Sequence, residues 1–257
     1  MNKLLASVAV AGSLLLSPFA ANAVIITHYD IDFSSPTHSV GTAPSTGAGM
    51  DQVSEIIFGT PTVESTFAGV SDPSLHFNAN ATTYEQIRLN MGQGYDNYQI
   101  SFDFYSSNLS DSDYAFTLLA DTPSVRNLSF SGTTGVRYWA PFTQPINGGS
   151  FADNTSYHVT VDYDLAIGSM SIWLNNGLLG SRAFTTSGED IESFRFSLSP
   201  AMGGTGLDPS IDVNLDNILV TSRTANAPEP STLLLFSLGL VGLASMRSLS
   251  DASRKRA

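Results

Sequence analysis

The sequence predicts an all-β protein, a two-sheet antiparallel β-sandwich flanked by two apolar ends. Short runs of β-branched and aromatic residues recur between Gly, Pro, Asn and Asp, and residues 24–224 show no sustained helical periodicity. Alternation is strictest over residues 98–105, whose apolar face consists of Tyr98, Ile100, Phe102 and Phe104. Packing two sheets face to face is the natural way to bury many such strands.

The N-terminal end is typical of a signal peptide. Lys3 precedes an apolar run over residues 4–16, and the small-residue triplet Ala21-Asn22-Ala23 follows Pro18. The run is shorter than the roughly 20 residues of a spanning helix. We therefore expect a signal peptide helix over residues 1–23, cleaved by signal peptidase after Ala23.

The domain that follows, residues 24–224, is expected to contain strands bounded by turn residues. The strand expected near residue 192 begins after Ile191, because Ile191 is out of register with Phe194 and Phe196. The expected strands are 25–33, 55–58, 75–78, 85–90, 98–105, 115–121, 125–131, 158–163, 170–174, 178–184, 192–197 and 211–221.

Residues 158–177 form the most informative stretch of the domain. A strand, a turn containing Gly168 and a second strand lead to Asn176-Gly177, the dipeptide of a type I′ hairpin. This pattern resembles the middle strands of laminin G-like and concanavalin A-like jelly rolls, and residues 212–220 resemble their closing strand. The resemblance covers most of residues 98–221 and implies a lectin-like jelly roll.

The C-terminal end combines a tripeptide, an apolar segment and a basic tail. Pro228-Glu229-Pro230 lies in a linker over residues 225–231, residues 232–247 are apolar up to Arg247, and residues 248–257 end on a basic cluster. That cluster is Arg254, Lys255 and Arg256. This order resembles the PEP-CTERM sorting signal, although residues 248–253 separate the segment from the basic cluster.

The resemblance implies a route for the protein. The tripeptide would be recognised by an exosortase-type processing enzyme while residues 232–247 hold the chain in the inner membrane as a transmembrane helix. The positive-inside rule places the basic tail in the cytoplasm. After processing, the domain would lie at the cell surface or in the extracellular matrix, as in a biofilm.

Composition restricts the partners of the domain. The whole chain has a net charge of −12 and no Cys, and residues 24–224 contain six Arg and no Lys. Nucleic acid is excluded as an expected partner because phosphate binding needs a basic face. Without disulfides, the stability of the domain must come from its core, with a bound cation as a possible addition.

Acidic residues near both ends of the domain suggest a structural calcium site. Asp212 and Asp216 share one face of a strand by period two, and the terminal strands of a jelly roll would bring them near Asp30 and Asp32. Calcium prefers six to eight oxygen ligands, which such a meeting can supply. The alternative is that this face is simply solvated.

Two observations bear on carbohydrate. Tyr138 and Trp139 lie in a stretch rich in Gly and Pro, where we expect a loop. Their aromatic rings could stack on sugars. The alternative is that aromatic side chains of this stretch fill the end of the sandwich. Asp190 and Glu192 have the spacing of glycosidase carboxylates, but the Glu-x-Asp-x-x-Glu motif of laminarinase-like proteins is missing, and an acidic loop explains them equally. His residues lack metal or triad spacing.

The sequence thus predicts a non-catalytic exported domain that binds or organises extracellular polysaccharide. Two alternatives remain open: a glycan-cleaving enzyme of the same architecture, and a structural matrix protein without a ligand.

Overall fold

The computed structural model describes most of the domain between the two predicted end segments. The expected signal peptide helix and transmembrane helix lie outside the described residues. Within the described part of the chain, no helix is long and apolar enough to cross a membrane. The described residues are 24–65, 73–79, 84–91, 95, 97–107, 116–121, 126–132, 135–140, 142–147, 151–184, 190–198 and 211–223.

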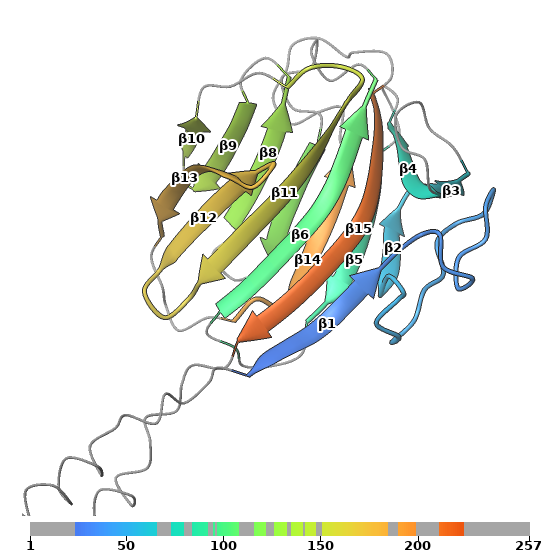
Figure 1. The fold of residues 1–257 in the computed structure, drawn as a ribbon, viewed down its shortest axis with the longest axis horizontal. Helices are drawn as coiled ribbons and strands as arrows, with labels where there is room; N and C mark the ends of the chain where they lie inside the picture. The colour runs from blue at the N-terminus through green and yellow to red at the C-terminus, as the bar shows by residue number, and fades with distance from the viewer. Residues whose placement is uncertain are drawn as a thin grey trace, which may run out of the picture. The chain divides into compact units, whose positions relative to one another are not determined.

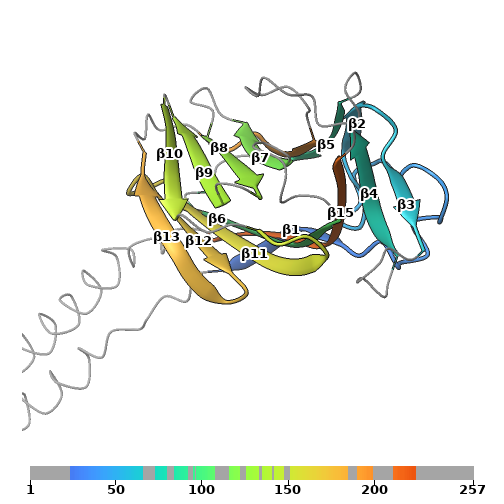
Figure 2. The ribbon, with the colours of Figure 1, turned by 90° about the horizontal axis from the view of Figure 1, so that it is seen from above.

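The domain consists of two antiparallel sheets packed face to face (Figures 1 and 2). The eight-stranded sheet contains, in spatial order, β13 (Gly177–Ala183), β12 (Ser169–Leu174), β11 (Thr155–Asp164), β6 (Asn97–Ser106), β15 (Ile211–Arg223), β4 (Ser74–Ala79) and β3 (Thr62–Glu64), and β1 (Ile25–Ile31) pairs with β15. The seven-stranded sheet contains β10 (Phe142–Asn147), β9 (Gly135–Ala140), β8 (Arg126–Ser131), β7 (Phe116–Asp121), β14 (Ser193–Leu198), β5 (Glu85–Asn90) and β2 (Glu55–Phe58). The predicted all-β sandwich is confirmed.

The core lies between the sheets and is rich in aromatic rings. Phe102 of β6 is fully buried, and its ring centroid lies 5.0 Å from that of Phe196 and 6.0 Å from those of Phe116 and Phe130. The last three residues belong to the opposite sheet. These edge-to-face contacts join the two layers, and the predicted inward face of residues 98–105 is confirmed.

β15 pairs along one edge with two different strands. Residues 211–215 pair with β4, and residues 218–223 pair with β1, so the first and last strands of the domain meet as predicted. Between the two segments, Asn217 has a φ of +51° and the register to β6 shifts. This bulge reverses the alternation, so Ile218 still faces the core.

The turn of the β12–β13 hairpin lies one residue earlier than predicted. Its two central residues are Asn175 and Asn176, with φ values of +48° and +66°, and Gly177 already belongs to β13 opposite Leu174. A type I′ turn needs positive φ at both central positions, and Asn tolerates this conformation. An Asn pair therefore replaces the expected Asn-Gly pair.

Residues 135–140 and 142–147 form two paired strands, β9 and β10, instead of the expected loop. Pro145 pairs opposite Arg137 in β10, which lies at the edge of the seven-stranded sheet. An edge strand can accommodate Pro because one side of its backbone needs no partner. The short strand β3 was also missing from the sequence-based prediction.

Candidate functional site

Two rows of mainly polar side chains cross the outer face of the seven-stranded sheet. The first row comes from five neighbouring strands, in which residues at paired positions project to the same side. Their neighbours Ile87, Phe194 and Phe196 face the core, so the row faces outward. Its members are Glu55, Arg88, Arg195, Leu119 and Asn127.

The second row runs beside the first, two residues further along each strand. Its four central side chains are polar but almost inaccessible, with exposed fractions between 0% for Ser129 and 7% for Thr117. Phe58 and Arg137 lie at its two ends. The members of the row are Phe58, Gln86, Ser197, Thr117, Ser129 and Arg137.

Carboxylates hold two guanidinium groups of the first row in place. Arg88 forms an ion pair with Glu55, its paired residue on β2. The Nη2 atom of Arg195 lies 2.8 Å from Oδ1 of Asp121, whose Oδ2 accepts a hydrogen bond from Ser193 at 3.1 Å. These pairs are partly exposed, so they contribute little to stability, but they orient the guanidinium groups.

Several polar atoms of the two rows have no hydrogen-bond partner in the structure. They are Oε1 of Gln86, Oδ1 of Asn127, Oγ of Ser129 and the Nε atoms of Arg88 and Arg195. Buried polar atoms are normally paired, and each unpaired one costs free energy. Each of these atoms is inaccessible to solvent, so the accessible polar groups of the first row include the partly exposed side chains that form its ion pairs.

Phe58, at one end of the second row, packs against the ring of Tyr84. The rings of Phe58 and Tyr84 lie 4.6 Å apart, and Phe58 is 48% exposed although it is a large apolar residue. An exposed ring beside polar side chains can pack on the apolar face of a sugar while its neighbours bind the hydroxyl groups. The pair comes from residues that the sequence-based reasoning did not select.

The outer face of the eight-stranded sheet is acidic. All seven acidic residues of its strands occupy outward positions, and two of its His residues lie against them: His158 Nδ1 is 2.6 Å from Asp103 Oδ1, and His76 Nδ1 is 2.9 Å from Glu64 Oε1. The seven are Asp30, Glu64, Asp103, Asp162, Asp164, Asp212 and Asp216.

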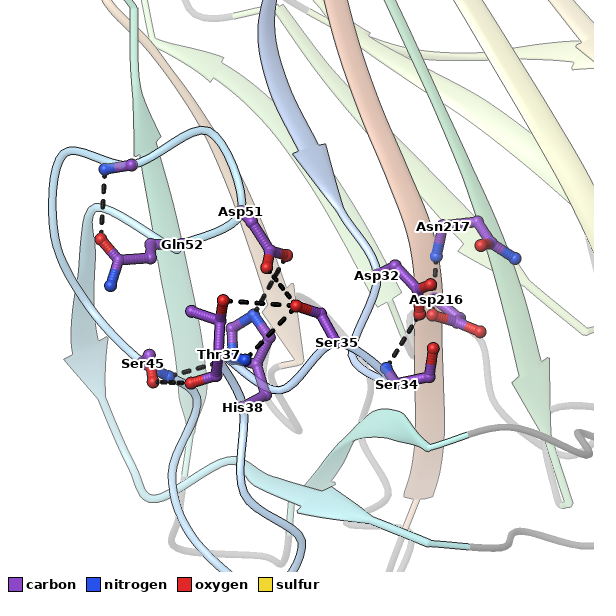
Figure 3. Close-up of polar contacts among 11 residues, drawn as sticks. Asp32, Ser34, Ser35, Thr37, His38, Ser45, Asp51, Gln52, Asp216 and Asn217 are labelled. Atoms are coloured by element: carbon purple, nitrogen blue, oxygen red, sulfur yellow. Dashed lines mark hydrogen bonds and ion pairs between the residues drawn. The ribbon is translucent and has the colours of Figure 1, made fainter.

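The structure separates the predicted calcium ligands. Asp32 lies beside Asp216 (Figure 3), whereas Asp212 lies against His76, with 3.4 Å between Oδ1 and Nε2. Asp30 is exposed on β1. Among the described residues, no three or more His, Asp or Glu side chains are arranged to hold a metal ion. The expectation that the four aspartates converge is wrong, because Asp212 and Asp216 lie four residues apart on the same strand, or roughly 13 Å.

The carboxyl group of Asp216 is buried at the bulge of β15. Burial raises its pKa to about 6, with further contributions from the nearby charges of Asp32 and Asp103. Backbone N–H groups of Asn217 and Phe33 donate hydrogen bonds to this carboxyl group and oppose the rise; the bond from Asn217 is 2.8 Å long. The surroundings of Asp216 therefore disfavour the charged form of its carboxyl group.

The loop after β1 brings a Ser, a His and an Asp together (Figure 3). The Ser35 hydroxyl donates to Asp51 Oδ2 at 2.5 Å, and His38 Nε2 lies 3.6 Å from Asp51 Oδ1. The other His38 nitrogen, Nδ1, accepts a hydrogen bond from the backbone of Ser45. Because Ser35 bonds to the carboxylate and not to His38, this arrangement lacks the nucleophile–base contact of a triad.

The predicted aromatic platform is not formed by Tyr138. This side chain belongs to the core and is 4% exposed, because residue 138 faces inward on β9. The backbone register pairs Trp139 with Asn127 of the first row, but the Trp139 side chain lies outside what the structure describes. Asp190 and Glu192 are exposed and precede β14, which agrees with the acidic-loop interpretation.

Comparison with known proteins identifies the sorting signal. Residues 226–248 match the family model of the PEP-CTERM protein-sorting motif. The chain thus carries this motif at its C-terminus and is an exported protein, with a C-terminal membrane anchor before processing. The match includes Pro228, Glu229, Pro230 and Arg247. No curated protein matches the chain.

Comparison with solved structures identifies proteins that share the fold of the domain. A structure titled "Cellulose induced protein, Cip1" is 11% identical with a TM-score of 0.55, and the match covers 77% of this chain and 99% of that one. A sialidase is 14% identical with a TM-score of 0.54, over 76% of this chain. The chain spans only 18% of the sialidase's length. Peanut lectin is 13% identical with a TM-score of 0.47, over 79% of this chain and 99% of the lectin.

Proposed function

We propose that this exported protein binds extracellular polysaccharide, without cleaving it, through the outer face of the seven-stranded sheet, at the first row and the exposed ring of Phe58. The observation that carries the proposal is the exposed ring of Phe58 near the partly exposed ion pairs of Arg88 and Arg195. Sugar hydroxyl groups both donate and accept hydrogen bonds, and sugar rings have apolar faces. The rows and the aromatic pair supply the complementary groups.

The positions of the carboxylates on this face argue against hydrolysis. Glycosidases place two carboxyl groups about 5–9.5 Å apart. Glu55 on β2 and Asp121 on β7 are separated by β5 and β14, so their backbones lie roughly 14 Å apart at about 4.8 Å per strand. Each is also engaged by an arginine. The face is therefore suited to binding and not to acid–base catalysis.

Intact-mass analysis of the protein from its native host tests the sorting part of the proposal. We expect a chain that begins at Val24 and ends near residues 228–230, recovered from the cell envelope or the medium. A chain that retains residues 232–257 in the membrane fraction would mean that the sorting tail is not removed and that the protein is an ordinary anchored surface domain.

Retention on insoluble polysaccharide from the host matrix tests the binding part. Phe58→Ala should weaken retention about three- to tenfold, since a ring contact contributes roughly 0.5–1.5 kcal/mol. Leu178→Ala is the matched control, because Leu178 is 62% exposed on β13, at the edge of the other sheet. Equal effects of the two substitutions would contradict the assignment of the site.

The same experiment separates the alternatives. Release of new reducing ends from the polysaccharide would identify an enzyme. Absence of both release and retention would leave a structural matrix protein without a ligand, and the binding proposal would fail.

A further inference from the structure

Cationic side chains are concentrated on one of the two sheets. The strands of the eight-stranded sheet carry seven acidic residues and two arginines, whereas those of the seven-stranded sheet carry three acidic residues and four arginines. No strand carries a Lys. Three of the four arginines, Arg88, Arg137 and Arg195, occupy outward positions, against two carboxylates, Glu55 and Asp121. In a chain with a net charge of −12, the outer face of the seven-stranded sheet is thus the one strand face where arginines outnumber carboxylates among the described residues.

Two of these arginines lie directly opposite each other. Arg88 and Arg195 are paired residues of β5 and β14 in the first row. Like charges at paired positions are destabilising, with Cβ atoms about 4.5–5.5 Å apart. Glu55 and Asp121 relieve part of this repulsion, each from the outer side of the pair. Folding alone would favour a neutral residue at one of the two positions.

The arginines retain hydrogen-bonding capacity after these ion pairs. Each guanidinium has five N–H donors, and the ion pairs engage the terminal Nη1 of Arg88 and Nη2 of Arg195. The Nε atoms of both residues are inaccessible to solvent, so a ligand would contact the terminal nitrogens of side chains that are 30% exposed in Arg88 and 21% exposed in Arg195. The carboxylates thus hold the guanidinium groups of two paired residues, and guanidinium groups are suited to binding planar anionic groups.

We infer that the polysaccharide bound by this face is acidic, and that Arg88 and Arg195 bind its carboxylate groups. This inference rests on the proposed function and specifies its ligand. The acidic outer face of the eight-stranded sheet would repel it, which fixes the binding side.

Binding of the processed protein to soluble polyuronate, compared with a neutral glucan, tests the inference. We expect the polyuronate to bind at least tenfold more tightly, and Arg88→Gln and Arg195→Gln each to reduce that affinity about tenfold. Arg182→Gln on β13 is the matched control and should change nothing. Arg195→Lys keeps the charge but loses the planar fork, so it should fall between the wild type and Arg195→Gln.

The outcomes separate the inference from the proposed function. Glucan binding equal to polyuronate binding would overturn the acidic ligand while leaving polysaccharide binding intact. Binding of neither polymer, nor of a sulfated one, would overturn both. Polyuronate binding that survives both Gln substitutions but is lost with a chelator would assign it to cation bridging on the acidic sheet. If the Gln variants fail to fold, preference of the wild type for polyuronate over glucan still decides the ligand class.

Discussion

The buried carboxyl group of Asp216 makes the stability of the domain depend on pH in a specific direction. Its pKa is raised from 3.8 to about 6 in the folded protein. Between these values the folded state binds more protons than the unfolded state, so the free energy of unfolding falls as pH rises. At about 1.4 kcal/mol per pKa unit, this group lowers the stability by about 3 kcal/mol in total, most of it between pH 4 and pH 7.

Substituting Asp216→Asn removes the charge and keeps the side-chain shape. One carboxyl oxygen becomes an NH₂ group, so a backbone N–H of Asn217 or Phe33 can lose its acceptor, at a cost of about 1 kcal/mol. The variant should therefore be about 2 kcal/mol more stable than the wild type at pH 7. Its advantage should disappear as the pH falls towards 4.

Urea unfolding at several pH values between 4 and 7.5, followed by intrinsic fluorescence, measures this difference directly. Asp30→Asn is the control, because Asp30 is an exposed carboxylate on β1. If the wild type and Asp216→Asn keep a constant difference across the whole pH range, the carboxyl group does not titrate near 6. A variant that is less stable at pH 7 would show that the charged form is favoured at the bulge, which would refute the reasoning.

Three further predictions concern the fold. Phe102→Ala, at the centre of the aromatic core, should lower the free energy of unfolding by about 3–5 kcal/mol in urea titrations; a loss below 1 kcal/mol would mean that the two sheets are not joined there. Asn176→Val should cost about 1–2 kcal/mol because of its positive φ, whereas Asn176→Gly should be nearly neutral; equal melting temperatures would contradict the turn assignment. Gly180→Ala would place its Cβ 2.7 Å from Ile146 Cγ2 and should cost about 1–3 kcal/mol. Gly177→Ala is its control, because its nearest contact is 3.4 Å away, and equal unfolding midpoints for these two variants would contradict the close approach of β13 to β10.

The candidate site was only partly visible in the sequence. Arg88 and Arg195 each occupy a polar position in a strand that was predicted, so their common outward direction could have been noticed. Their pairing could not, because 106 positions along the chain separate them and only the sheet register makes them neighbours. Tyr138 was wrongly expected in a loop, because its stretch of the sequence is rich in Gly and Pro. It lies instead in β9, and Pro145 is accommodated in the neighbouring strand β10 at the edge of the sheet.

By itself, the sequence determined the features that depend on local pattern. Alternation with period two specified most strands and the inward face of β6, and the order of tripeptide, apolar segment and basic residues specified the sorting signal. Only the tertiary structure decided which strands are neighbours, where β15 bulges, and therefore which polar side chains form rows. The physical reason is that side-chain direction is a property of one strand, whereas a site across a sheet depends on hydrogen-bond register between segments far apart in the chain.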